Sequence, residues 1–124
     1  MANTTRLQLS PHFRIEEFDC KDGTRVPKAA EPALRELCVH VLEPMRKKYG
    51  PCTIHSGYRH AAYNRKIGGA TRSEHIYDLN PKSVAADIHF KKGNPVQWAR
   101  GARWRFRTKA LWRKGKRGGV GLYG

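Results

Sequence analysis

One amphipathic stripe constrains the fold of this chain more than any other feature. Between residues 31 and 49, apolar side chains recur at spacings of three and four, which predicts one long helix with a single buried face. The stripe consists of Leu34, Leu37, Cys38, Val41, Leu42 and Met45. Pro44 lies inside this helix and removes a backbone donor, so we expect a kink there. In 124 residues, such a helix leaves room for one domain, which we expect to span residues 1–124.

The other predicted elements are short. Ser10 and Pro11 have the pattern of an N-cap followed by proline, so we expect a short helix from Pro11 to near Asp22. Strands are expected at 52–56 and 84–90, and the start of a last strand at 118–123. Further helices are expected at 61–67 and from Asn94-Pro95 onward. This order predicts an α+β domain with a small, mostly antiparallel sheet packed against helices.

Positive charge is concentrated toward the end of the chain. The net charge is +15, no acidic residue follows Asp87, and residues 91–117 contain eleven Lys and Arg. This Trp- and Arg-rich segment predicts a polyanion or an acidic surface as partner, with a merely solvated basic face as the alternative. Its aromatic residues fit stacking on nucleobases or packing on the core, and we favour core packing for Trp98. The predicted basic surface comprises Arg100, Arg103, Arg105, Arg107, Lys109, Arg113 and Lys114.

Several classes of protein are excluded by what the sequence lacks. Its apolar runs are far shorter than the ~20 residues of a membrane span, and its first residues lack the apolar stretch of a signal peptide. Three cysteines, Cys20, Cys38 and Cys52, do not form a disulfide framework or a CxxC pair. We therefore expect a protein made in a reducing cytoplasm.

The segment from Ser56 to His89 carries the candidate chemistry. His75 is predicted in a loop and Asp87 in an apolar strand, and both residue types bind zinc. An unpaired carboxylate in such a strand is costly, so Asp87 needs a metal ion or a buried arginine as partner. A surface histidine beside a structural aspartate is the plainer interpretation of the same two residues.

Five motifs in a fixed order resemble those of the M15 metallopeptidases. They are SGYR at 56–59, Asn64, the turn at 68–70, Ser73-x-His75, and AADI at 85–88. The segments SPHFRIEEFDCKDG, VLEPMRKKYG and GGVGLYG are similar to the same family in its phage-type branch, so the resemblance covers residues 10 to 124. It implies the fold shared by the Hedgehog and D,D-peptidase proteins, and the activity of zinc carboxypeptidases and phage endolysins that cut peptidoglycan.

The resemblance also assigns roles to individual residues. It implies that His75 and Asp87 are zinc ligands and that Arg59 binds a substrate carboxylate or the oxyanion. A buried structural ion pair is the open alternative for Arg59. Ser73 would brace the loop that holds His75 and face the substrate. Tyr58 would lie near the substrate or, like Asn64, serve packing.

The sequence departs from the family pattern at two places. Eleven residues, 76–86, separate His75 from Asp87, where the family has a shorter spacer, so we expect a small inserted loop at 77–81. The family's third ligand, a histidine, and its acidic general base follow the GVGxY strand, and the printed sequence ends at Gly124. Four explanations are open: a longer gene product, a neighbouring subunit, His89 as substitute ligand, or loss of catalysis.

Two functions follow from these predictions. The first is a zinc-dependent peptidoglycan peptidase domain of phage type, which cleaves a stem-peptide amide at the cell wall. The alternative is an inactive M15-like component of a phage virion, in the tail or on the capsid, which docks its basic face on an acidic neighbour or an anionic wall polymer. Nucleic acid is a weaker third partner. In either case we expect synthesis in the cytoplasm of a bacterial host.

Overall fold

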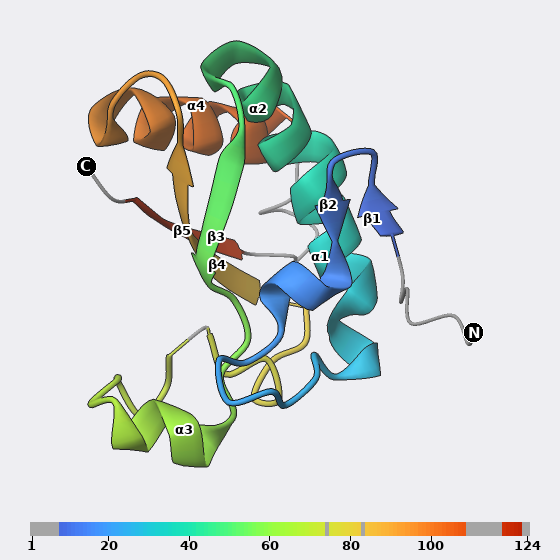
Figure 1. Cartoon of the computed structure of the whole chain (residues 1–124), viewed down its shortest axis with the longest axis vertical. Coiled ribbons are helices and arrows are strands. Elements are labelled where there is room, and N and C mark those ends of the chain that lie inside the picture. Colours follow the sequence, from blue (N-terminus) through green and yellow to red (C-terminus); the bar gives the residue numbers. More distant parts are fainter. Residues whose placement is uncertain (1–7, 74, 83, 109–117, 123–124) are drawn as a thin grey trace.

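The computed structural model describes residues 8–73, 75–82, 84–108 and 118–122, with side chains up to residue 102. A sheet of three strands lies in the middle of the molecule, with helices α2 and α4 at one end and α3 at the other (Figure 1). Two of the three strand pairings in the described part are antiparallel. The predicted α+β class with a mostly antiparallel sheet is therefore confirmed.

The chain begins with a two-stranded hairpin, not with the predicted helix. Strand β1 (Gln8–Ser10) pairs antiparallel with β2 (Phe13–Arg14), and a 3-10 helix, η1 (Ile15–Phe18), follows. The helix predicted from Ser10 and Pro11 is wrong because the fixed φ of proline suits the turn of a hairpin as well as the first turn of a helix. Ser10 instead donates its hydroxyl to Glu43 Oε2 at 2.7 Å.

The predicted long helix is present and contains a change of pitch. After the short 3-10 turn η2 (Lys28–Ala30), helix α1 (Glu31–Leu37) continues through the π-helical segment η3 (Cys38–Leu42) into α2 (Glu43–Tyr49). The amide of Glu43 bonds to the carbonyl of Cys38, five residues back. Pro44 has no amide proton, and its ring crowds the carbonyl four residues earlier. The irregularity expected at Pro44 therefore takes the form of a wider turn just before it.

The central sheet has the strand order β3-β4-β5. Strand β3 (Cys52–Ser56) runs antiparallel to β4 (Val84–Phe90), and β5 (Gly118–Leu122) runs parallel to β4 on its other side. The register of the first pair shifts between Ile54 and Ser56, which sets Ser56 opposite Asp87. This irregularity lies at the residues that the sequence predicts to be functional.

Two further helices flank the sheet. Helix α3 (Ala61–Lys66) follows β3 after a short connection, and α4 (Pro95–Thr108) follows β4. Trp98 is buried on α4, as predicted, and donates its indole N–H to the carbonyl of Lys92 at 2.9 Å. No helix in the described part of the chain is long and apolar enough to cross a membrane.

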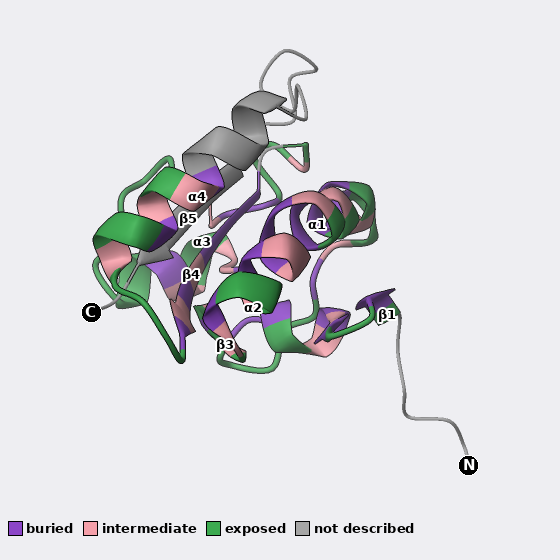
Figure 2. Ribbon diagram, turned by 90° about the horizontal axis from the view of Figure 1, so that it is seen from above, coloured by how far each residue is buried: buried purple, intermediate pink, exposed green. Residues whose placement is uncertain are grey.

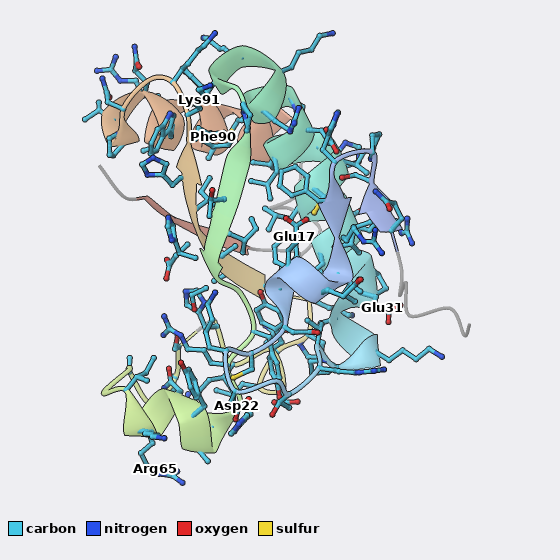
Figure 3. The ribbon with its side chains drawn as sticks, viewed as in Figure 1. Glu17, Asp22, Glu31, Arg65, Phe90 and Lys91 are labelled. Carbon is cyan, nitrogen blue, oxygen red and sulfur yellow. The ribbon has the colours of Figure 1, made fainter. Side chains whose placement is uncertain are left out.

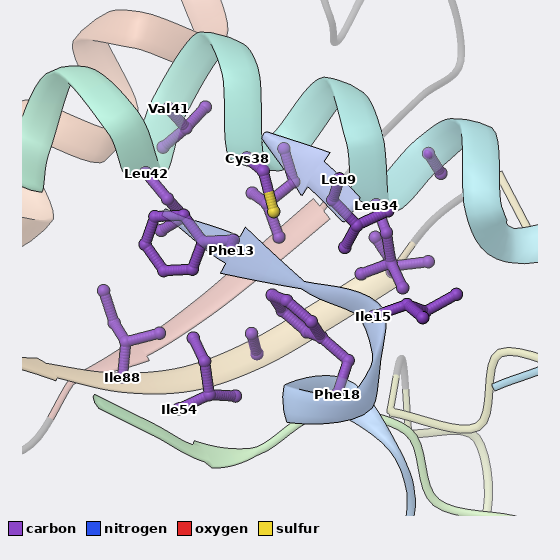
Figure 4. Packing of buried hydrophobic residues seen from close by; sticks show 14 of the residues in the cluster. Leu9, Phe13, Ile15, Phe18, Leu34, Cys38, Val41, Leu42, Ile54 and Ile88 are labelled. Atoms are coloured by element: carbon purple, nitrogen blue, oxygen red, sulfur yellow. The ribbon is translucent and has the colours of Figure 1, made fainter. Parts of the chain in front are cut away.

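The core lies between the long helix, the hairpin and one face of the sheet (Figure 4). Figure 2 shows the buried surface of α1 and α2 turned inward and exposed residues on the outer side of α4. Each large side chain removed from water contributes roughly 1.5–3 kcal/mol. The principal residues are Leu9, Phe13, Ile15, Phe18, Leu34, Val41, Leu42, Met45, Ile88 and Phe90.

Candidate metal centre

His75 is held in one orientation by the loop that follows α3. Its Nδ1 lies 2.7 Å from the carbonyl oxygen of Gly57, which can only accept a hydrogen bond. Nδ1 therefore carries a ring proton, and Nε2 is the nitrogen left to bind a metal ion when the ring is neutral. The backbone of His75 is fixed too, because its amide donates to Ser73 Oγ at 3.1 Å and its carbonyl accepts from the amide of Arg59 at 2.8 Å.

The free nitrogen of His75 faces the carboxylate of Asp87. Asp87 lies in β4, opposite Ser56, and its Oδ2 is 3.4 Å from His75 Nε2. Only 12% of the His75 side chain and 16% of the Asp87 side chain are exposed. Two ligand atoms that bind one tetrahedral zinc ion at 2.0–2.2 Å stand about 3.3–3.6 Å apart. The pair therefore fits a zinc ion by chemistry, orientation and spacing.

Arg59 is the third polar side chain of this site. Its Nη2 lies 3.4 Å from Asp87 Oδ2, its Nε donates to Ser56 Oγ at 3.1 Å, and its Nη1 donates to Asn64 Oδ1 at 3.3 Å. The guanidinium group is thus fixed on three sides beside the candidate metal pair. This geometry is compatible with both roles considered for Arg59. Arg59 forms an ion pair with Asp87, and its guanidinium group also lies beside the candidate metal pair.

Asn64 positions Arg59 and depends on a glycine to do so. Asn64 is 2% exposed, and its amide donates to the carbonyl of Ala70 at 2.7 Å. A Cβ atom at Gly69 would overlap the Asn64 side chain, and Gly68 has a φ of +78°. The Gly68-Gly69 turn is therefore required by close approach and by backbone conformation.

The loop between the two candidate ligands is anchored in the core. Tyr77 is fully buried and donates its hydroxyl to the carbonyl of Ala85 at 2.6 Å. Tyr58 packs against Tyr77 with ring centroids 5.4 Å apart and donates to Asp78 Oδ2 at 2.5 Å. Burial, with the Asp78 carboxylate, raises the pKa of Tyr58 far above its ordinary value. A substrate contact by Tyr58 stays a prediction, because here its hydroxyl bonds the loop.

The remaining predicted residues lie elsewhere or outside the described side chains. The ring of His89 contacts Trp98 at 5.4 Å and His55 at 5.9 Å between centroids, which turns it toward α4. Arg100 is exposed on α4. The other predicted basic residues have side chains outside the described part, namely Arg103, Arg105, Arg107, Lys109, Arg113 and Lys114.

A second cluster was not predicted from the sequence. Cys20, Asp22 and His60 place ligand atoms within 4.8 Å of one another. From the sequence alone, His60 is expected to be a packing or surface residue. It lies 38 residues after Asp22, so no local pattern indicates that the two side chains meet. The one signal in the sequence is the Cys20-x-Asp22 spacing, with a single residue between two possible ligands.

Comparison with known proteins agrees with the resemblance. A family model described as Peptidase M15 matches residues 11–117. A search of the curated proteins found no match, and neither did a search of the solved structures. The matched range includes His75, Asp87 and Arg59.

Proposed function

This chain belongs to the peptidase M15 family, and from that premise we propose that it is a zinc-dependent peptidase of phage type that hydrolyses a stem-peptide amide of peptidoglycan. The observation that carries this proposal is the 3.4 Å separation between His75 Nε2 and Asp87 Oδ2. The resemblance supports the substrate, the metal and the phage origin in this proposal. The spacing of His75 and Asp87 also supports the metal.

His75 and Asp87 are the residues that would hold the ion. Because Gly57 keeps the ring proton on Nδ1, His75 offers Nε2 without losing a proton. Asp87 adds a negative charge from a rigid strand, flanked by β3 and β5. When bound, zinc supplies Lewis-acid polarisation of the scissile carbonyl and lowers the pKa of water.

Arg59 is the residue that would bind substrate. Three of its five N–H donors are directed to Ser56, Asn64 and Asp87. The remaining two can donate to a substrate carboxylate or to the developing oxyanion. The fixed guanidinium needs no reorganisation when that charge appears, which is the basis of its expected contribution to the rate.

The last strand leads the chain past the candidate metal pair. Catalytic zinc takes three protein ligands, of which His75 and Asp87 supply two. Strand β5 lies beside β4 with Gly121 opposite Asp87. This register agrees with a family arrangement in which the third ligand follows that strand.

A direct test is the cleavage of peptides that represent the peptidoglycan stem. Purified full-length protein is assayed on a D-Ala-D-Ala and an L-Ala-D-Glu peptide, beside His75→Ala and His55→Ala. His55 is an exposed histidine on β3 and serves as the matched control. We expect cleavage by wild type and His55→Ala and none by His75→Ala. Equal cleavage by all three proteins would refute the proposed site.

A second candidate function is a structural phage component without peptidase activity. The observation that favours it is the uneven charge, with eleven Lys and Arg and no acidic residue in 91–117. Lys91, Lys92 and Arg100 of this segment are exposed. Stoichiometric amounts of the protein in purified virions, together with normal assembly of His75→Ala, would support this function over the first.

A further inference from the structure

A second group of metal-ligating side chains lies between the turn after η1 and the start of α3. It contains the thiol of Cys20, the carboxylate of Asp22 and the imidazole of His60, with ligand atoms within 4.8 Å of one another. His60 Nε2 lies 2.5 Å from Asp22 Oδ2. Figure 3 shows Asp22 in the loop beside α3, while Arg65 points away on the outer side of that helix.

The turn that carries Cys20 and Asp22 is held by its own hydrogen bonds. The amide of Cys20 donates to the carbonyl of Thr24, and the amide of Gly23 donates to the carbonyl of Cys20, both at 2.9 Å. The amide of Thr24 donates to Asp22 Oδ1 at 3.0 Å. Asp22 Oδ2 is thereby left to face His60.

The segment that carries His60 is joined to the same region. The amide of Tyr58 donates to the carbonyl of Phe18 at 2.7 Å. A Cβ atom at Gly57 would lie 2.7 Å from the Phe18 backbone, so only glycine permits this approach. His60 follows two residues after Tyr58 and is the N-cap of α3. The two segments therefore meet at a fixed distance.

The chemistry of the three side chains favours a metal over a reactive cysteine. Cys20 is 3% exposed, and burial raises the pKa of its thiol, so Cys20 is a poor nucleophile at neutral pH. Thiolate, imidazole and carboxylate together suit zinc and similar divalent transition ions. Asp22 is exposed and leaves the cluster open to solvent on one side.

We propose that Cys20, Asp22 and His60 form a second zinc site, separate from His75 and Asp87, which ties the turn after η1 to the start of α3. Three protein ligands leave a fourth position for water. Because His60 directly follows Arg59 in the chain, the ion would also restrain the segment that presents Arg59 to the first site.

Metal binding exchanges protons in a defined way. Without metal, His60 Nδ1 accepts from the amide of Tyr63 at 3.2 Å, so Nε2 carries the ring proton and donates it to Asp22. Binding through Nε2 moves that proton to Nδ1 and ends the bond from Tyr63. The Cys20 thiol loses its proton to solvent as the thiolate binds. The exchange releases one proton per ion bound.

Cobalt(II) distinguishes this site from the first, because only this one contains a thiolate. Metal-free full-length protein is titrated with cobalt(II), and the ultraviolet thiolate-to-cobalt charge-transfer band is recorded. We expect the band in wild type, in His75→Ala and in Cys52→Ser, and its loss in Cys20→Ser. Cys52→Ser is the control for a thiol outside the cluster. The peptidase assay of His75→Ala is independent of this band, so the two proposals fail separately.

Asp22→Asn is a second test of the cluster, which applies even if Cys20→Ser does not fold. Asp22 is exposed, and its amide variant keeps the shape of the side chain. We expect cobalt(II) affinity to fall about tenfold or more in Asp22→Asn. A wild type without the band, a band retained in Cys20→Ser, or an unchanged affinity in Asp22→Asn would overturn the second site.

Discussion

Nε2 of His75 faces Oδ2 of Asp87 at 3.4 Å, although eleven residues separate them in the chain. The longer spacer does not move them apart, because Tyr77 bonds to Ala85 and returns the loop to β4. His75 and Asp87, with the contacts of His75 to Gly57 and Ser73 and of Asp87 to Arg59, make up the candidate metal centre.

Tyr77→Phe tests whether this loop sets the metal pair. The change leaves the buried carbonyl of Ala85 without the hydroxyl that now donates to it at 2.6 Å. We expect a loss of about 1–2 kcal/mol in the free energy of unfolding. Zinc affinity should fall as well, because the loop carries His75. Urea unfolding and a zinc titration measure both, and unchanged values would show that the hydroxyl does not anchor the loop.

Gly69→Ala tests the close approach of the turn to Asn64. The added methyl overlaps the Asn64 side chain, so we expect destabilisation by about 2 kcal/mol. Gly68→Ala is the matched control, because its cost comes only from a φ of +78° and should be about 1 kcal/mol. Denaturant unfolding compares the two variants. A smaller effect at Gly69 than at Gly68 would contradict the packing described here.

Arg59→Lys separates a fixed guanidinium from a simple positive charge. Lysine keeps the charge but cannot donate to Ser56, Asn64 and Asp87 together. We expect peptide turnover to fall by about tenfold or more, with zinc content retained. Arg65→Lys, on the exposed side of α3, is the control and should keep full turnover. Full turnover in Arg59→Lys would assign the residue a purely structural role.

Glu43 makes the stability of the hairpin depend on pH. Its carboxylate accepts from Ser10 Oγ, the amide of His12 and His12 Nδ1, each at 2.7 Å. Burial opposes ionisation, but these bonds outweigh it and hold the pKa of Glu43 below its ordinary value of 4.5. The stability that Glu43 contributes is therefore complete above pH 4.5 and is lost as pH falls through the lowered pKa.

The variant Glu43→Gln should show that pH dependence directly. We expect the substitution to lower the free energy of unfolding by about 1 kcal/mol at neutral pH. The difference should become smaller in acid, where the wild type loses the same bonds. Unfolding by urea at several pH values measures the difference. A constant difference between the two proteins across this range would contradict the assigned titration.

Much of the fold could be predicted from local patterns. The strands Cys52–Ser56 and Val84–Phe90 and the helical run from Glu31 to Tyr49 match the predicted ranges, because turn residues and apolar periodicity mark their ends. The first helix was predicted wrongly, because Ser10 and Pro11 suit two local structures. In the folded chain Ser10 bonds to Glu43, 33 residues away, and no local pattern reveals this contact.

The candidate site could also be predicted only in part from the sequence. His75, Asp87 and Arg59 were found from residue types and a family resemblance. The roles of Asn64 in fixing Arg59 and of Gly57 in fixing the His75 tautomer depend on side-chain and backbone contacts across the fold. The cluster of Cys20, Asp22 and His60 joins two segments far apart in sequence. Such contacts appear only when the chain is folded.

The most direct test of the central claim is a zinc titration in an Asp22→Asn background, which weakens the second site. Metal-free protein and its His75→Ala and Asp87→Asn derivatives are titrated by calorimetry. We predict that the Asp22→Asn protein binds one zinc ion tightly, and that the affinity for this ion is about tenfold or more lower in each derivative. Equal zinc affinity in all three proteins would show that His75 and Asp87 do not share a metal ion.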